Sequence, residues 1–222
     1  MADGPIIGRV RSLNVGVPRT VRWHDRDVTS AIWKSPVTGR RRVRGVNVDG
    51  DDQADRRVHG GETKSLYVYA AEDYRWWSDR LGQDLEPGTF GENLTTTGLD
   101  PAAALVGERW AVGTATVRVT EPRIPCFKLG IRMGDAGFVD RFADAGRPGT
   151  YLAIEQEGEV GPGDDIVRLD RPAAGITVGD VERTYHGHAD LLAALVESPE
   201  LSTSWHAWAE RRLGRARAEG TG

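Results

Sequence analysis

Short alternating segments occupy most of this chain between residues 5 and 170, and they constrain its fold more than any other feature. Apolar and polar residues alternate in them, Val, Ile, Thr and aromatic residues are frequent, and Gly, Pro, Asp and Asn stand at their ends, as in half-buried β-strands. We expect strands within residues 6–13, 26–33, 41–48, 65–70, 109–113, 114–120, 150–156 and 164–170. Because no long helical crossovers separate these segments, the pattern predicts a mainly β protein, either a barrel or a sandwich.

Helical signals are few in the strand-rich part of the chain. One helix is expected over residues 70–82, where Gly82 provides a C-terminal stop. Shorter helical turns are expected over residues 126–133 and 137–146. These few helices leave the strands as the main component of the fold.

The segment after Pro172 has the 3.6-residue period of helices instead of the alternation of strands. Thr177 followed by Asp180 predicts the start of a first helix, and residues 188–198 predict a second. In the third helix, large apolar residues share one face, namely Leu201, Trp205, Trp208, Ala209 and Leu213. We therefore expect a β-rich domain over residues 1–171 and a small three-helix bundle over residues 172–222.

Composition and charge exclude several classes of protein. The chain has 222 residues, one cysteine and a formal net charge of -4. A single cysteine allows no internal disulfide, which suits a reducing cytoplasm. The first residues lack the features of a signal peptide, and no apolar run approaches the ~20 residues that span a bilayer. We therefore expect a cytoplasmic protein that neither enters a membrane nor stably binds nucleic acid.

The sole cysteine, Cys126, stands in the segment EPRIPCFKLG, whose residues suit a reactive thiol. Pro122 and Pro125 fix two backbone φ angles just before it. Arg123, Lys128 and the start of an expected helix would each favour the thiolate over the thiol. A small buried apolar side chain is the alternative. As a thiolate, Cys126 would be either a nucleophile or a soft metal ligand.

A histidine followed by two glycines forms a second candidate segment. His59 is the best candidate for a base near Cys126, although a histidine in such a turn is more often structural. Gly60 and Gly61 would let the backbone approach a ligand closely. The residues that follow resemble the end of a phosphate-binding loop, but Thr63 stands where that motif requires glycine. A nucleotide hydrolase is therefore excluded.

Other polar segments carry weaker signals. Residues 88–98 are either a tight turn into a strand or a loop whose backbone and Asn93 amide bind a polar ligand. The basic run at residues 40–44 is either a solvated strand or part of a phosphate site. The acidic turn at residues 47–55 lacks the final glutamate of a calcium loop. The HGH motif at residues 186–188 offers too few ligands for a metal site.

Several of these segments together resemble the MOSC-domain family, named after the C-terminal domain of molybdenum cofactor sulfurase. The motifs occur in the family's order along the chain: TSAIWKSPV, HGGETKSLYVY, PGTFGENL, GERWAVG, EPRIPCFKL and GTYLAI. The first residues and the helical end resemble the YiiM-like branch, which has a C-terminal three-helix domain. One departure is GER at residues 107–109, where GDR is expected. The resemblance implies a MOSC-type β-barrel with a few short helices and a C-terminal three-helix bundle.

The resemblance also implies an activity. The molybdenum cofactor (molybdopterin) would bind with Cys126 as its protein metal ligand, and the enzyme would reduce small N-hydroxylated bases or amidoximes to the amine level. Two electrons would come from an external reductase, because the chain shows no flavin, haem or iron–sulfur motif. Pyridoxal phosphate binding is a further possibility at the level of the family. The chain is expected to be a monomer or a homodimer.

The family motifs assign further residues to the site by resemblance. The catalytic residues would be Cys126 and His59, and His59 or Glu92 would deliver protons. The residues expected to bind the cofactor are Lys34, His59, Gly60, Gly61, Lys64, Gly91, Glu92, Asn93 and Arg123. A second hypothesis stays open, in which the protein only carries the cofactor, or carries sulfur as a persulfide on Cys126.

Overall fold

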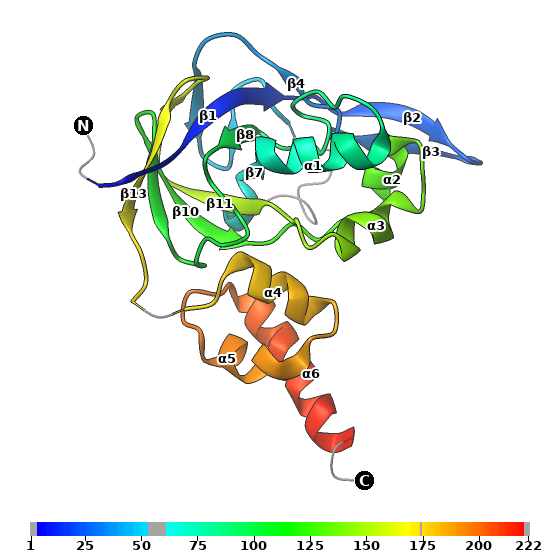
Figure 1. Cartoon of the computed structure of the whole chain (residues 1–222), viewed down its shortest axis with the longest axis vertical. Helices are drawn as coiled ribbons and strands as arrows, with labels where there is room; N and C mark the ends of the chain where they lie inside the picture. The colour runs from blue at the N-terminus through cyan, green and yellow to red at the C-terminus, as the bar shows by residue number, and fades with distance from the viewer. Residues whose placement is uncertain (1–3, 53–60, 174, 220–222) are drawn as a thin grey trace.

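The structure is a computed structural model that describes residues 4–52, 61–173 and 175–219. Seven strands form a closed barrel in the order β13-β9-β10-β11-β7-β8-β1, because β13 also pairs with β1. The strands are β1 (Ile6–Val15), β7 (Leu66–Ala70), β8 (Leu94–Thr97), β9 (Arg109–Val112), β10 (Ala115–Glu121), β11 (Thr150–Gln156) and β13 (Asp165–Asp170). This arrangement confirms the predicted mainly β fold and selects the barrel over the sandwich (Figure 1).

The burial of side chains along the barrel strands follows the alternation in the sequence. In β10, Ala115, Val117 and Val119 are buried, whereas Thr116 and Arg118 between them are partly exposed. Strand β7 departs from this pattern, since all of its residues are buried. Its second face carries Tyr67 and Tyr69, which pack in an aromatic cluster with Tyr74, Trp77, Phe90, Phe138 and Phe142 instead of facing water. This cluster fixes the end of the barrel beside the helices.

The barrel strands are antiparallel except for one pair. Strands β7 and β8 run parallel, so the chain must cross over between them. The crossover contains α1 (Ala71–Leu81), which ends at Gly82 in the left-handed conformation with a φ of 64°. The predicted stop at Gly82 is therefore confirmed. Two more helices, α2 (Phe127–Met133) and α3 (Phe138–Asp144), follow the cysteine segment.

The remaining strands lie outside the barrel, and two predicted strands differ from the structure. Instead of one strand over residues 26–33, β2 (Arg19–Trp23) and β3 (Arg26–Ser30) form a hairpin that projects from the molecule (Figure 1). Instead of one strand over residues 41–48, a turn separates β5 (Arg41–Arg44) from β6 (Asn47–Val48). β12 (Gly158–Val160) pairs with β5, and β4 (Ser35–Pro36) pairs with β1.

The last part of the chain is helical, with α4 (Val178–Tyr185), α5 (Leu192–Glu197) and α6 (Thr203–Glu219). Thr177 and Asp180 form a capping box, in which each side chain accepts a hydrogen bond of 3.0 Å from the other residue's backbone. These helices lie beside the barrel, and α6 points away from it (Figure 1). The division between residues 171 and 172 stays a prediction. Within the described residues, no helix is long and apolar enough to cross a bilayer.

Candidate functional site

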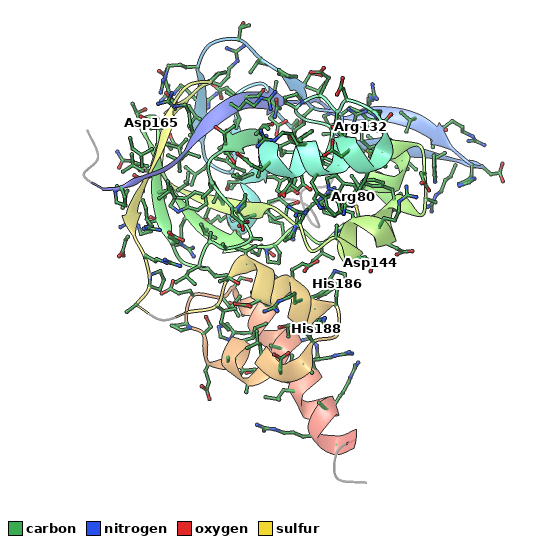
Figure 2. All side chains as sticks on the ribbon, viewed as in Figure 1. Arg80, Arg132, Asp144, Asp165, His186 and His188 are labelled. Carbon is green, nitrogen blue, oxygen red and sulfur yellow. The ribbon has the colours of Figure 1, made fainter. Side chains whose placement is uncertain are left out.

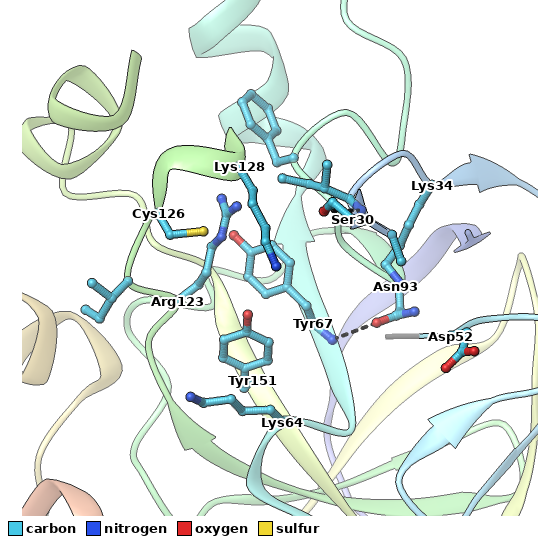
Figure 3. Close-up of a pocket in the computed structure, with 15 residues that line it drawn as sticks. Ser30, Lys34, Asp52, Lys64, Tyr67, Asn93, Arg123, Cys126, Lys128 and Tyr151 are labelled. Atoms are coloured by element: carbon cyan, nitrogen blue, oxygen red, sulfur yellow. Dashed lines mark hydrogen bonds between the residues drawn. The ribbon is translucent and has the colours of Figure 1, made fainter. Parts of the chain in front are cut away.

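A pocket lies where the barrel brings together segments that are far apart in the sequence (Figure 3). Its wall comes from the residues after β3, the start of β7, the loop before β8, the segment after β10 and the start of β11. Residues predicted from the sequence meet in this wall, namely Lys34, Lys64, Gly91, Asn93, Arg123 and Cys126. Five residues, Cys126, Arg123, His59, Asn93 and Lys34, were expected to converge on one cleft. The structure brings four of them together there, and His59 lies outside the described residues.

Cys126 sits at the transition from extended chain to helix. Its backbone is extended (φ -127°, ψ 170°), and α2 begins at the next residue. The side chain is half-buried and lines the pocket, which differs from a cysteine packed in an apolar core. Proline at 122 and 125 restricts the backbone before it. The segment therefore holds a thiol at the pocket wall.

Arg123 is the most deeply buried cation of the pocket, with an exposed fraction of 6%. Its guanidinium carbon lies 5.4 Å from the ring centroid of Tyr67 and 5.1 Å from that of Phe142. Its Nη1 atom is buried and has no hydrogen-bond partner among the described residues. Leaving a buried charged donor without an acceptor costs free energy. This arrangement points to a ligand that supplies an acceptor, most simply an anionic oxygen.

Two lysines add positive charge to the same wall. Lys64 and Lys128 both line the pocket, and Figure 3 shows Lys128 beside Arg123 with Lys64 on the other side of Tyr151. The Lys64 ammonium lies 4.0 Å from a carboxylate oxygen of Glu121. Within the described part of the chain, Lys128 forms no ion pair. Three cations around one small space favour a phosphate group.

The pocket is also lined by two tyrosines, Tyr67 and Tyr151, that were not predicted to be site residues. Their ring centroids are 5.2 Å apart, and the Tyr67 hydroxyl donates a hydrogen bond of 2.7 Å to the Pro148 carbonyl. Burial raises the pKa of Tyr151 to about 12, although Arg123 opposes this shift. Its phenol is therefore neutral at pH 7 and can donate a hydrogen bond. Alternation gives no common signal for these rings, because Tyr151 follows the polar Thr150 whereas Tyr67 follows the apolar Leu66 in a strand that is buried throughout.

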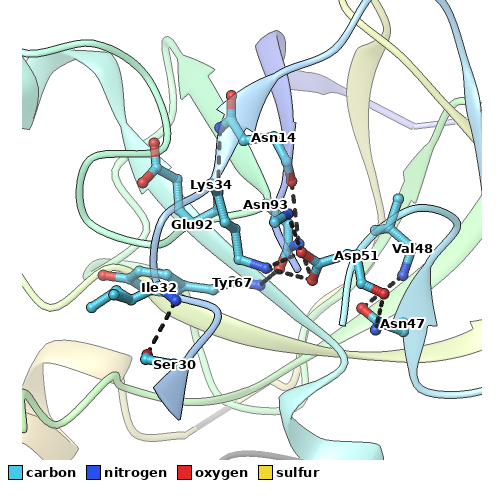
Figure 4. A network of polar contacts seen from close by, with 11 residues as sticks. Asn14, Ser30, Ile32, Lys34, Asn47, Val48, Asp51, Tyr67, Glu92 and Asn93 are labelled. Atoms are coloured by element: carbon cyan, nitrogen blue, oxygen red, sulfur yellow. Dashed lines mark hydrogen bonds and ion pairs between the residues drawn. The ribbon is translucent and has the colours of Figure 1, made fainter. Parts of the chain in front are cut away.

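Lys34 and Asn93 belong to a polar network at the opposite wall (Figure 4). Its centre is the buried Asp51, which forms an ion pair with Lys34 and accepts hydrogen bonds from Asn93 Nδ2 (2.9 Å) and the Gly16 backbone (2.8 Å). Asn93 Oδ1 accepts a hydrogen bond of 3.1 Å from the Tyr67 backbone. Burial lowers the pKa of Lys34, and the charge of Asp51 opposes this shift. The network stiffens this wall of the pocket.

Glu92 is fully buried and does not line the pocket. Its Oε1 atom accepts hydrogen bonds from the Tyr74 hydroxyl (2.6 Å), the Gly88 backbone (2.7 Å) and Thr95 Oγ1 (2.7 Å). Burial raises its pKa, and these hydrogen bonds oppose the shift. The structure therefore does not bring Glu92 to the site, and its carboxylate holds together the loop before β8.

The glycines and histidines of the predicted site differ in position. Gly91 lines the pocket with a φ of 79°, and a Cβ atom there would lie 2.9 Å from Ile32 Cγ1, so only glycine fits. Gly61 is exposed at the start of the short η1 helix (Glu62–Lys64) and does not line the pocket. His59 and Gly60 lie outside the described residues.

The HGH motif lies apart from this pocket. His186 and His188 belong to the C-terminal helical part of the chain (Figure 2). No group of three or more histidine, cysteine or acidic side chains that could hold a metal ion occurs among residues 4–52, 61–173 and 175–219.

The fold and this pocket define a MOSC-domain protein. The family model of the MOSC domain matches residues 55–167, and the chain belongs to this family, whose members are associated with the molybdenum cofactor. The Bacillus subtilis protein YflK, named as uncharacterized, is 35% identical over 201 residues, which cover 89% of this chain and 91% of YflK. The crystal structure of YiiM from Geobacillus stearothermophilus covers 93% of this chain and 99% of its own, with a TM-score of 0.76 and 31% identity. These likenesses support the YiiM-like branch.

A third relative carries a functional name. A Gibberella moniliformis protein named Reductase is 31% identical over 181 residues, which are 79% of this chain but 32% of that protein. Most of that protein therefore lies outside the matched region.

Proposed function

We propose that this protein is a molybdenum-cofactor-dependent reductase of small N-hydroxylated compounds, in which Cys126 is the protein ligand of the metal. One observation carries the proposal: the sole cysteine of the chain lines a pocket beside a buried arginine whose Nη1 atom has no hydrogen-bond partner among the described residues. Family membership and the relative named Reductase support it further.

The residues of the pocket fit the cofactor in chemical type. The Cys126 thiolate would supply a soft sulfur ligand to the metal of the cofactor. Arg123, Lys64 and Lys128 would bind the pterin phosphate, since all three line the pocket. When bound, the cofactor would supply the two-electron removal of oxygen from nitrogen, and the overall reaction consumes two electrons and two protons and releases water.

The remaining wall residues have simpler roles in this proposal. Ile32 and Phe90 are apolar wall residues that limit the access of water. The Tyr151 hydroxyl, neutral at pH 7 because burial raises its pKa to about 12, would donate a hydrogen bond to a ligand in the pocket that it lines. A separate reductase delivers the electrons to the metal. His59 as a proton donor stays a prediction.

The test begins with metal analysis of the protein produced in a host that makes the molybdenum cofactor and is supplied with molybdate. We expect bound molybdenum and reduction of an amidoxime with an artificial electron donor. Cys126→Ser should nearly abolish activity per bound molybdenum, because a hydroxyl is a harder ligand and deprotonates less readily than a thiol. It should change the free energy of unfolding by less than about 1 kcal/mol, since the side chain is half-buried and similar in size.

The outcomes separate the proposal from its alternatives. Full activity per molybdenum in Cys126→Ser would refute the ligand role. Activity lost only in proportion to molybdenum content would show that the thiol retains the cofactor without tuning it. Bound cofactor without turnover in the parent protein would favour the carrier hypothesis.

A further inference from the structure

A tryptophan of the C-terminal helices is hydrogen-bonded to the strand that leads into the pocket. Trp205 Nε1, on α6, donates a hydrogen bond of 2.6 Å to Glu121 Oε2, at the end of β10. Both side chains are buried, with exposed fractions of 7% for Trp205 and 4% for Glu121. The bond joins residues that are 84 positions apart.

Glu121 lies opposite Tyr151 of the pocket wall in the pairing of β10 with β11. It is the last residue of β10 and precedes the segment of Arg123 and Cys126. The oxygen that accepts the Trp205 hydrogen bond, Oε2, also lies 4.0 Å from the ammonium of Lys64, which lines the pocket. The neighbouring Thr120 hydroxyl donates a hydrogen bond of 2.6 Å to the Thr63 carbonyl. The segments that carry Glu121 and Lys64 are therefore held side by side.

The Trp205 indole N–H and the Lys64 ammonium both lie near the same oxygen, Glu121 Oε2, and therefore compete for it. A buried carboxylate oxygen that loses its donor is costly, and it then attracts the nearest cation more strongly. For Glu121 Oε2 that cation is Lys64. The indole N–H satisfies the oxygen with a neutral group, so that Lys64 is drawn no closer to Glu121 than the observed 4.0 Å.

We propose that Trp205 is a positioning residue for the anion-binding wall: by hydrogen bonding to Glu121, it keeps Lys64 directed toward a phosphate in the pocket. The C-terminal helices then contribute to the affinity of the site without lining it. The inference rests on the proposed function for the identity of the phosphate, which belongs to the pterin cofactor. The shared oxygen itself requires no cofactor.

The experiment uses inorganic phosphate as the probe and Cys126 as the reporter. Since Cys126 is the sole cysteine, its rate of alkylation by iodoacetamide reports on the pocket alone, and protection by added phosphate gives a dissociation constant. Trp205→Phe keeps an aromatic, though smaller, side chain and removes the N–H donor. We expect it to raise the dissociation constant for phosphate by about threefold to fivefold, the effect of one partly exposed charge contact.

Trp208→Phe is the matched control. Trp208 lies on the same helix, with its ring centroid 5.4 Å from that of Trp205, and its indole makes no hydrogen bond within the described residues. This variant should leave phosphate protection unchanged. Thermal unfolding of both variants shows whether a difference arises from stability instead.

The effect of Trp205→Phe is also measured in a protein that carries Glu121→Gln, where the carboxylate charge is absent. The neutral amide no longer attracts Lys64 but is similar in shape, so this variant alone should bind phosphate more tightly than the parent, and adding Trp205→Phe should then have little effect on affinity. An equal loss in both backgrounds would show a merely structural role and overturn the proposal. The absence of phosphate protection in the parent would also overturn it. None of these measurements needs molybdenum or turnover, so they can fail while the proposed activity stands.

Discussion

Lys34 shows how a residue assigned to cofactor binding can carry a structural task. Its ammonium contacts Asp51, and the side chains expose 8% and 1% of their surface. Breaking such a pair by removing one partner leaves an uncompensated buried charge. The neutral replacement of both partners avoids that cost.

Lys34→Met should therefore lower the free energy of unfolding by about 3 kcal/mol or more. Asp51→Asn added to that variant should restore much of the loss, and a double-mutant cycle measured in urea isolates the interaction. Arg44→Met is the control, because the pair of Arg44 with Asp49 is exposed at 59% and 37% and should contribute less than about 1 kcal/mol. Similar small losses in both variants would mean that Lys34 serves the ligand and not the fold.

The sequence predicts a site residue best where the residue type and its immediate neighbours are sufficient to indicate its role. Cys126 and Arg123 are set apart by composition and by the prolines around them, and the structure places both in the pocket wall. Glu92 and Asn93 were predicted together, but hydrogen bonds from Tyr74, Gly88 and Thr95 hold the Glu92 carboxylate within the protein. Asn93 faces the pocket and Glu92 does not. Asp51 was considered only as part of an acidic turn, because its partners are distant in sequence.

At the scale of elements, local signals were sufficient for helices and less so for strands. Thr177 and Asp180 form the predicted cap of α4, since capping depends on residues three apart. For β8 (Leu94–Thr97) the sequence predicts only a turn or a ligand-binding loop, because glycines lie on both sides of it. Its pairing with β7 is parallel and non-local, so no turn signal in the sequence indicates it.

Helix α4 also carries a buried acid with a predicted effect on stability. Burial raises the pKa of Glu182 to about 7, and Arg183 opposes the shift. Its side chain is 4% exposed. Since the folded state holds this proton more tightly than the unfolded state, the stability that the group contributes is complete below about pH 4.5 and is lost as the pH rises to about 7.

Glu182→Gln should remove this loss. We expect the variant to exceed the parent in free energy of unfolding by about 2 kcal/mol at pH 8, with the difference shrinking toward pH 4. Urea titrations across this range measure it. Glu197→Gln, an exposed position on α5, is the control and should differ little from the parent. A variant less stable than the parent at pH 8 would contradict the assignment of Glu182 as a buried acid.

At the scale of the whole molecule, the contacts between the barrel and the C-terminal helices bear on the proposed division at residues 171 and 172. The backbone of Val106 donates a hydrogen bond of 3.0 Å to Ile176, and that of Val178 donates one of 2.9 Å to Ala104. Apolar residues of both parts belong to one buried cluster, including Val119 of β10 and Leu195 of α5. The two parts therefore share core and backbone pairing.

This sharing predicts that the chain unfolds as one unit. Calorimetry should show a single transition whose calorimetric and van't Hoff enthalpies agree, and a chain ending at residue 171 should unfold at a lower temperature because it loses the helices that cover the shared core. Far-ultraviolet circular dichroism, which follows the helices, and labelling of Cys126, which follows the pocket, should change together. An early helical transition that leaves Cys126 protected would show that the three-helix bundle is an independent domain and that its contacts contribute little to the stability of the barrel.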